Sequence, residues 1–274
     1  MSQPIGVIVT GANRGIGKAI CEAILKSTSL PAVKLYACSR SGDDLGLKAS
    51  NTRSSIIYRK LDIADRKSVE DLSVNVDESQ QEINVLINNA GINLDREASV
   101  DIAKKTLEVN YYGTLNMCQS VIPYMGKGAR IVNVSSIASL LKVYDEPIRQ
   151  RFRTAKSLIE LESIANDYVS AVSKGEEEAS GFGVPCRSYN VSKALLNGAT
   201  RILAEEHADV QINSCCPGWV ASGMGALIGK PPKTLEEGAV IPMRLAFGDI
   251  GDISGQFWCN SSVRSREAGE VRQP

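Results

Sequence analysis

The sequence predicts a doubly wound α/β fold, in which helices cover both faces of a parallel sheet. Three observations support this: short β-branched runs recur along the chain, amphipathic segments separate them, and a glycine-rich turn follows the first run. The runs span 5–10, 32–39, 55–61, 83–88, 129–135, 209–215 and 255–259. Their almost continuous apolar character is typical of strands buried on both faces. We therefore predict one domain over 1–274, with a parallel seven-stranded sheet and right-handed crossovers.

The segment after the first run shows the helical pattern most clearly. Its apolar residues recur at i, i+3, i+4, i+7 and i+8, which is the spacing of a helix packed on a sheet. They are Ile16, Ala19, Ile20, Ala23 and Ile24.

Composition narrows the function classes. The 31 basic and 31 acidic residues balance, and no basic stripe stands out, so nucleic acid is not an expected partner. No segment approaches the roughly 20 apolar residues of a membrane span, and the start MSQPIGVIVTGANRG lacks the pattern of a signal peptide. We expect a cytoplasmic protein without a membrane partner.

Cysteine and histidine usage argues against a metal site. The seven cysteines are scattered without a CxxC pair, which fits a reducing compartment. The only histidine, His207, ends a helical pattern, where a cation is mildly favourable. A Ser-His pair or a histidine-bound metal is therefore excluded as the centre of the mechanism.

One segment interrupts the alternation of strands and helices. The 52 residues from 137 to 188 contain no strand pattern, and SLIELESIANDYVSAVSK repeats apolar residues at helical spacing. We predict a helical insertion over about 138–187 that lies against the sheet. The charged sequence GEEEASGFG that follows the long helix is expected to be a solvated loop.

The glycine turn after the first strand predicts a dinucleotide site. Gly11 lets the chain turn sharply, Gly15 lets the backbone approach a pyrophosphate, and Gly17 lets the helix pack closely on the strand. The anion would lie at the N–H groups that open the helix. A strand before the glycines and a helix after them is the context that this motif requires.

The end of the second strand indicates which dinucleotide binds. An NAD site usually places an acidic residue there, but this chain has Ser39-Arg40 and no acidic residue before Asp43. Arg40 and Arg14 could hold a 2′-phosphate through charge-assisted hydrogen bonds. The sequence thus favours NADP(H), and the alternative is that Arg40 is an ordinary surface arginine.

Tyr189 and Lys193 are spaced four residues apart at the start of a helical pattern. Residues i and i+4 share a helix face, so the phenol and the amine can approach one site together. The spacing alone is weak evidence, because such pairs are common on surface helices.

Six short motifs occur in a characteristic order along the chain. They are TGxxxGxG at 10–17, Asn88-Asn89-Ala90-Gly91, Asn110 in VNYYGT, Ser135-Ser136, Tyr189-x-x-x-Lys193 and Pro217-Gly218. Together they resemble the short-chain dehydrogenase/reductase family, which has a Rossmann-type fold, over essentially the whole chain. The sequence NVSSIxS, the long insertion and CCPGWV at 215–220 resemble the carbonyl reductase branch.

The resemblance implies four catalytic roles. Tyr189 would donate the proton to the substrate oxygen, and Lys193 would lower the pKa of Tyr189 and hold the nicotinamide ribose. Ser136 would stabilise the charge on the substrate oxygen, and Asn110 would position a water that links Lys193 to solvent. The alternative for Asn110 is a buried amide that packs on backbone. For Ser135, we favour a role in satisfying turn N–H groups.

The same resemblance implies a set of cofactor contacts. They are Gly11, Asn13, Arg14, Gly15, Ile16, Gly17, Arg40, Asp62, Asn89, Ala90, Gly91, Tyr189, Lys193, Pro217, Gly218, Val220 and Ser222. Asp62 would contact the adenine, or would instead cap the helix that begins near Asp65.

The insertion and the segment 219–233 are expected to shape the substrate pocket. Trp219, Met224, Leu227 and Ile228 suggest an apolar lining, with Leu141 and Tyr144 as further contributors. The insertion would also cover the helical face through which related proteins form oligomers, which predicts a monomer. The alternative is that the insertion docks another protein. Of Cys215 and Cys216, we favour buried, inert thiols over reactive ones.

The resulting prediction is an enzyme that uses NADP(H) to reduce small-molecule aldehydes, ketones or quinones. The alternatives are a dehydrogenase dedicated to one secondary metabolite, and a protein that senses NADPH without turnover. The complete set of Asn110, Ser136, Tyr189 and Lys193 argues against the sensor, because binding alone requires neither the tyrosine nor the lysine.

Overall fold

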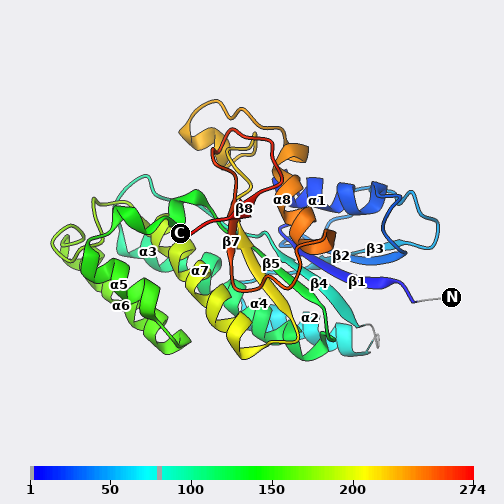
Figure 1. The fold of residues 1–274 in the computed structure, drawn as a ribbon, viewed down its shortest axis with the longest axis horizontal. Coiled ribbons are helices and arrows are strands. Elements are labelled where there is room, and N and C mark those ends of the chain that lie inside the picture. Colours follow the sequence, from blue (N-terminus) through cyan, green and yellow to red (C-terminus); the bar gives the residue numbers. More distant parts are fainter. Residues whose placement is uncertain (1–2, 79–81) are drawn as a thin grey trace.

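A computed structural model describes residues 3–78 and 82–274. Its single sheet has the strand order β3-β2-β1-β4-β5-β6-β7-β8 (Figure 1). The strands are β1 (Ile5–Thr10), β2 (Val33–Ser39), β3 (Ser55–Lys60), β4 (Ile83–Asn88), β5 (Arg130–Val134), β6 (Gln211–Cys215), β7 (Phe257–Cys259) and β8 (Glu270–Val271). The pairs from β3 to β7 are parallel, and the order reverses direction between β1 and β4, so the predicted doubly wound fold is confirmed.

The eighth strand corrects the predicted number of seven. β8 pairs antiparallel with β7 through only two residues, Glu270 and Val271. So short an edge strand leaves no alternation pattern for sequence analysis to detect.

Helices cover both faces of the sheet, as predicted. They are α1 (Gly15–Lys26), α2 (Arg66–Glu78), α3 (Val100–Leu107), α4 (Thr114–Val121), α5 (Glu146–Thr154), α6 (Leu158–Lys174), α7 (Ser188–Glu206) and α8 (Leu235–Phe247). One apolar cluster joins α1 and α8 to one face, and another joins α2, α4 and α7 to the opposite face. The carboxyl ends of the central strands remain between these layers.

The insertion forms a third apolar cluster with α7. Leu161, Ile164 and Tyr168 of α6 pack against Val191 and Leu195 of α7, together with residues of α3 and α5. Gly198 of α7 makes room for this contact, because a Cβ there would lie 2.9 Å from a Leu161 methyl carbon. Figure 1 shows α5 and α6 on the far side of α7 from the sheet. The predicted coverage of this helical face by the chain's own apolar surface is therefore observed.

The return loop after α6 is mostly exposed, as predicted, but part of it is buried. Glu177 is only 3 % exposed and Phe182 is 1 % exposed. Phe182 stacks edge-on against Tyr168, and the Phe182 N–H donates to the Glu177 carbonyl at 2.9 Å. The loop is thus folded back into the insertion, because its aromatic residue completes the third cluster.

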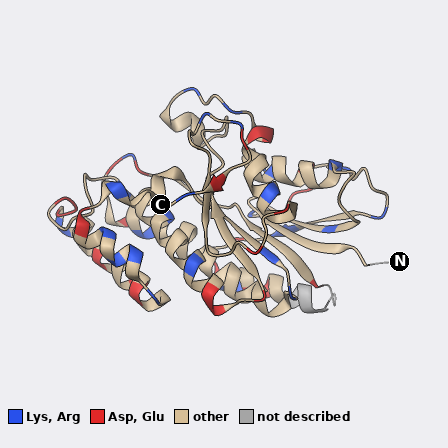
Figure 2. Ribbon diagram, viewed as in Figure 1, with Lys and Arg blue, Asp and Glu red and all other residues tan. Residues whose placement is uncertain are grey.

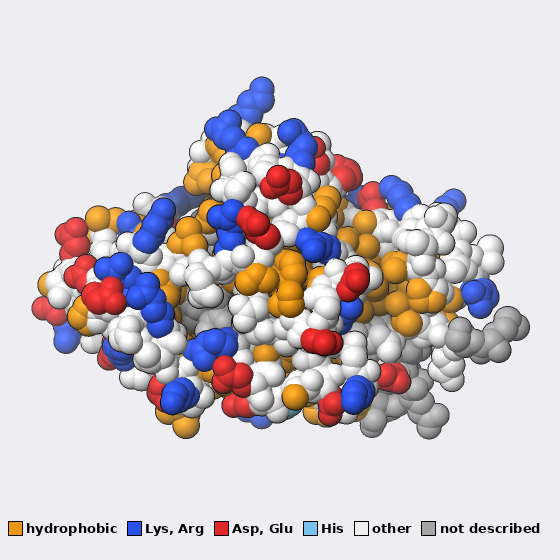
Figure 3. Space-filling view, viewed as in Figure 1, with side chains coloured by type: hydrophobic (Ala, Val, Ile, Leu, Met, Phe, Trp, Pro, Cys, Tyr) orange, Lys and Arg blue, Asp and Glu red, His pale blue; other side chains and the backbone are white. Residues whose placement is uncertain are grey.

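Charges of both signs are interspersed along the elements (Figure 2). On the face shown in Figure 3, acidic and basic side chains alternate around a central group of hydrophobic side chains. Within residues 3–78 and 82–274, no helix is both long and apolar enough to cross a membrane. The same residues hold no cluster of three or more potential metal ligands.

The packing of the insertion can be tested by truncating one buried leucine. Leu161→Ala should lower the free energy of unfolding by about 3 kcal/mol, because it opens a cavity between α6 and α7. Urea unfolding monitored by circular dichroism measures the change. Ile159→Ala is the matched control, because Ile159 lies on the same helix but is 77 % exposed. Equal effects of the two variants would contradict the packing described here.

Candidate active site

The turn between β1 and α1 is held against the end of β4. Gly11 has φ 65°, and a Cβ on Gly17 would lie 2.2 Å from the Gly11 carbonyl oxygen, so both positions require glycine. The Asn89 side chain donates to the carbonyls of Thr10 at 3.0 Å and Gly11 at 3.3 Å. The Thr10 hydroxyl in turn accepts from the N–H groups of Asn89 and Ala90, each at 3.0 Å.

The residues of this turn fit a pyrophosphate. Arg14 is the N-cap residue of α1, and no side chain caps the helix through a hydrogen bond. The first N–H groups of the helix are therefore suited to an anion. Asn13, Arg14 and, at the end of β2, Arg40 are exposed, so their side chains are free to approach a phosphate.

The loop after β6 lies beside the glycine turn. The Ser222 Cβ lies 3.6 Å from the position that a Cβ on Gly15 would take. The Ser222 hydroxyl accepts from the Gly225 N–H at 3.1 Å. Val220 is only 2 % exposed and packs against α8 beside Ile16, so its side chain belongs to the core and only its backbone can meet a ligand.

Asp62 follows β3 and forms a local turn. Its carboxylate accepts from the Ala64 N–H at 3.0 Å. The carboxylate that accepts from the first turn of α2 is that of Asp65, not that of Asp62. Its donor is the Lys67 N–H, at 3.0 Å. The capping alternative for Asp62 is therefore wrong, and its adenine contact stays a prediction.

Tyr189 lies in the first turn of α7, and a residue from outside the helix holds that turn. The Asp95 carboxylate accepts from the Tyr189 N–H at 2.8 Å. Burial raises the pKa of Asp95, while this hydrogen bond and those to Ser188 lower it. Asp95 thus supplies an acceptor for a free N–H group in the first turn of α7.

The serine loop after β5 is tied to the same helix. Asn190 donates to the Ala138 carbonyl at 2.9 Å, and Asn197 donates to the Ser139 hydroxyl at 2.8 Å. The Ser136 hydroxyl accepts from the Ala138 N–H at 3.1 Å. Ser136 is also close enough to the Tyr189 phenol to lower the pKa of that phenol. The structure therefore brings Ser136 and Tyr189 together.

Ser135 has a structural role, but through a different group from the one predicted. Its hydroxyl donates to the Lys193 carbonyl at 3.4 Å, whereas turn N–H groups were expected as partners. Because Ser135 directly follows β5 and Lys193 is in α7, this contact joins the two elements.

Burial controls the acidity of the tyrosine. It raises the pKa of Tyr189 above the usual value of the phenol, and the hydrogen bond with Ser136 opposes that rise. The Lys193 ammonium lies 5.7 Å from the centre of the Tyr189 ring. A lowering of the Tyr189 pKa by Lys193 stays a prediction, because the Ser136 contact is the one that lowers it here.

Lys193 is a buried cation at 4 % exposure. Its Nζ donates to the Val134 carbonyl at 2.9 Å, and burial lowers the pKa of Lys193 to about 8. A Cβ on Gly91 would lie 3.5 Å from this Nζ and 3.2 Å from the Asn110 side-chain oxygen. Gly91, Asn110 and Lys193 therefore meet at one point.

Asn110 lies in a π-helical turn, Glu108–Gly113, between α3 and α4. Its side chain pairs with both backbone groups of Ile92, accepting from the N–H and donating to the carbonyl, each at 2.8 Å. It also donates to the Ser192 hydroxyl at 3.0 Å. The Ser192 hydroxyl in turn donates to the Tyr189 carbonyl at 2.8 Å. Asn110 is thus a buried amide that contacts backbone and connects the loop after β4 to α7, so its role in a proton relay stays a prediction.

Sequence analysis missed three residues of this region: Asp95, Ser192 and Lys233. Lys233 is 1 % exposed, and its Nζ donates to the Pro217 carbonyl at 2.8 Å. Burial lowers the pKa of this ammonium. The lysine at the end of the apolar stretch 219–233 could have indicated a special role. The sequence does not reveal that its side chain is buried.

The substrate side also differs in part from the prediction. Leu141 and Tyr144 belong to the buried cluster of the insertion and do not line an open pocket. Leu227 and Ile228 are 48 % and 72 % exposed on the segment 219–233, which stands away from the body at the top of Figure 1. The indole N–H of Trp219 donates to the Gly225 carbonyl at 2.9 Å, within the same segment.

A doubly wound sheet with a glycine turn at the end of β1, where the strand order reverses, defines the class of nucleotide-binding α/β proteins. Within that class, the profile of the family described as short chain dehydrogenase matches residues 6–148. The chain belongs to this family.

Individual relatives agree with this assignment. The (+)-neomenthol dehydrogenase of Arabidopsis thaliana is 31% identical, over 89% of this chain and 91% of that protein. Carbonyl reductase [NADPH] 3 of Mus musculus is 33% identical, over 87% of this chain and 89% of that protein. The structure of salutaridine reductase from Papaver somniferum matches with TM-score 0.79 and 27% identity, over 92% of this chain and 99% of that one. The predicted resemblance to the carbonyl reductase branch is therefore confirmed.

The role of Asp95 in holding α7 can be tested by mutation. Asp95→Ala should lower the free energy of unfolding by about 1 kcal/mol, because it removes the acceptor at the start of the helix. Asp95→Asn should retain most of this stability, since an amide oxygen also accepts from an N–H. Thermal unfolding of both variants, beside the control Glu97→Ala at an exposed neighbouring position, measures the effect. Unchanged stability in Asp95→Ala would show that the contact does not hold the helix.

Proposed function

We propose that this protein reduces aldehydes, ketones or quinones to alcohols with NADPH. The observation that carries the proposal is the convergence of Ser136, Tyr189 and Lys193 beside the end of β5. Carbonyl reductases [NADPH] among the relatives support both the reaction and the cofactor.

The cofactor assignment also rests on the residues of the cleft. Gly11, Gly15 and Gly17 shape the turn that fits the pyrophosphate, and Arg14 and Arg40 are exposed for a 2′-phosphate. Asn89, Ala90, Gly91, Pro217 and Gly218 would form the walls of the cleft. When bound, the nicotinamide would supply the hydride for the carbonyl carbon.

The protein's own groups would manage the proton and the charge. Tyr189 keeps its proton at neutral pH because burial raises its pKa, so it is available to protonate the substrate oxygen. Ser136 would donate a hydrogen bond to that oxygen as charge develops. Lys193 would hold the ribose and favour the tyrosinate that remains after proton transfer, while Asn110 holds the loop beside Lys193 in place.

Substrate class and assembly follow from the surroundings of the site. The exposed apolar side chains of Leu227 and Ile228 favour apolar carbonyl compounds over sugars or acids. We also propose a monomer, because the insertion packs apolar side chains over α7 and leaves little of that helix for a second subunit. A cytoplasmic location is proposed because the scattered cysteines fit a reducing compartment.

The proposed function is tested by oxidation of NADPH and NADH with a quinone, an aromatic aldehyde, an aliphatic ketone and a terpenoid ketone. NADPH-dependent turnover of several compounds is expected, and Tyr189→Phe should lower kcat by about 100-fold or more, because it removes the proton donor. Binding of NADPH, followed by its fluorescence, should be unchanged in this variant. Near-normal turnover by Tyr189→Phe would refute the role of the tyrosine, and equal efficiency with NADH would refute the cofactor preference.

The pH dependence of reduction should report Lys193. Its pKa in the folded protein, about 8, lies below the ordinary value of 10.5, so the ammonium loses its proton as the pH rises through about 8. Because the Tyr189 pKa is raised, the phenol is still protonated there and cannot cause the same change. We expect kcat/KM for the carbonyl substrate to fall above pH 8 in the wild type.

Lys193→Arg is the matched variant for this profile. A guanidinium keeps its charge above pH 12, so the fall near pH 8 should disappear even though the overall rate is lower. A wild-type profile that stays flat to pH 10 would contradict the assignment.

A further inference from the structure

Two cysteines lie on neighbouring strands beside the proposed cofactor site. β6 and β7 are parallel, with Ser214 opposite Phe257 and Cys215 opposite Trp258. The ladder continues one step further, because the Cys216 N–H donates to the Trp258 carbonyl at 2.9 Å. Cys216 is therefore in register with Cys259, and both belong to one small apolar cluster with Phe257.

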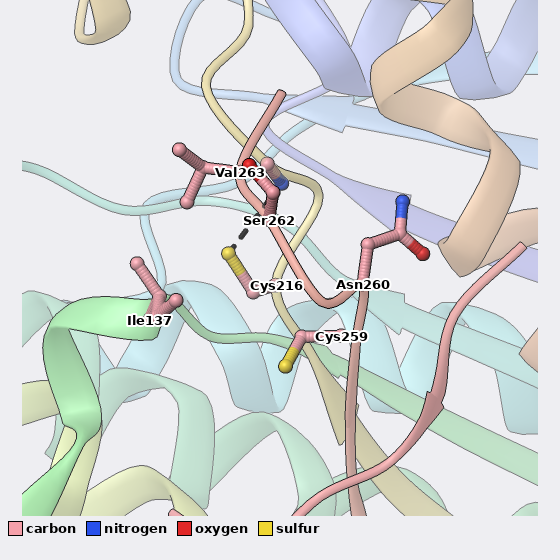
Figure 4. Close-up of a pocket in the computed structure, with 7 residues that line it drawn as sticks. Ile137, Cys216, Cys259, Asn260, Ser262 and Val263 are labelled. Atoms are coloured by element: carbon pink, nitrogen blue, oxygen red, sulfur yellow. Dashed lines mark hydrogen bonds between the residues drawn. The ribbon is translucent and has the colours of Figure 1, made fainter. Parts of the chain in front are cut away.

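Both thiols line the same crevice (Figure 4), together with Ile137, Gly218, Asn260, Ser262 and Val263. Each is 4 % exposed, whereas Cys21, Cys38 and Cys215 are 0 % exposed. Cys215 belongs to the apolar cluster on the opposite face of the sheet. Cys216 and Cys259 thus line one crevice, and the adjacent Cys215 is not part of it.

Several groups near Cys216 would stabilise its thiolate. The Gly218 N–H donates to the Cys216 sulfur at 3.4 Å. Burial raises the pKa of Cys216, but this N–H, the Ile137 backbone and the ammonium groups of Lys233 and Lys193 all lower it. For Cys259, burial raises the pKa to about 11. Because the Gly218 N–H already donates to its sulfur, Cys216 is the thiol that we assign as the attacking one.

We propose that Cys216 and Cys259 are a redox-active dithiol that a peroxide converts to an intramolecular disulfide. The Cys216 thiolate attacks the peroxide O–O bond and becomes a sulfenic acid, and hydroxide leaves to form water with the thiol proton. The Cys259 sulfur then displaces the sulfenic oxygen as a second water, which forms the S–S bond. Two thiols are oxidised and one peroxide is reduced to two waters.

The strand geometry permits this bond. Neighbouring strands lie about 4.8 Å apart, within the Cα separations of about 4.4–6.8 Å that disulfides span. Forming the bond takes the Cys216 sulfur away from the Gly218 N–H. Because Gly218 has φ 91° and Pro217 is held by Lys233, the turn that they form would have to adjust. The disulfide should therefore weaken binding of NADPH, a consequence that rests on the proposed function.

The test compares the reduced wild-type protein with Cys259→Ser and with Cys186→Ser, the control at the more exposed cysteine. After treatment with hydrogen peroxide, the wild type should lose two of its seven free thiols. Tryptic peptides 202–233 and 245–264 should be joined, and dithiothreitol should separate them. The Kd for NADPH should rise by about tenfold or more in the wild type and in Cys186→Ser, but not in Cys259→Ser.

Three results would overturn the proposal: no loss of thiols, a bond within peptide 202–233 that joins Cys215 to Cys216, or dimers joined through Cys186. A 202–233 to 245–264 cross-link with unchanged NADPH affinity would refute the coupling to the cofactor cleft. If the reduced protein does not bind NADPH, the proposed function fails, while the cross-linked peptides still decide the dithiol.

Discussion

The attachment of α7 to the end of β5 is the constraint on which the rest of the site depends. The Lys193 ammonium donates to the Val134 carbonyl at 2.9 Å, and the Ser135 hydroxyl donates back to the Lys193 carbonyl at 3.4 Å. An ammonium in an apolar interior is costly unless its donors are satisfied. The helix therefore has one favourable position along the strand, and that position places Tyr189 beside Ser136.

A chain of buried amides fixes the same register from inside the sheet. Asn88 of β4 donates to Asn133 of β5 at 2.9 Å, and Asn133 donates to the Thr200 hydroxyl of α7 at 2.9 Å. Losing one member would leave a buried polar group without its partner, at a cost of about 1–3 kcal/mol. A slip of α7 would break this chain and the lysine contact together, so the two reinforce each other.

The sequence was sufficient for features that depend on local pattern. Apolar runs predicted the parallel strands, and the spacing of four placed Tyr189 and Lys193 on one face of α7. It was not sufficient where a side chain acts far from its place in the chain. Asp95 meets the start of α7 across 94 positions of sequence, and Glu177 is buried although its neighbours are charged. Burial of a charged side chain depends on tertiary packing, which no local pattern records.

The two buried ammonium groups explain how the site could be prepared for its ligand before the ligand arrives. Lys193 donates to the carbonyl of Val134, the last residue of β5. Lys233 donates to the carbonyl of Pro217, which follows β6. An ammonium has three donors, and a single carbonyl uses one of them. The remaining donors are suited to the hydroxyl and amide oxygens of a nucleotide, which would recover part of the desolvation cost. The fold thus holds both ammonium groups in place before the ligand binds. Charges that are already in place can stabilise a bound ligand with little reorganisation of the protein.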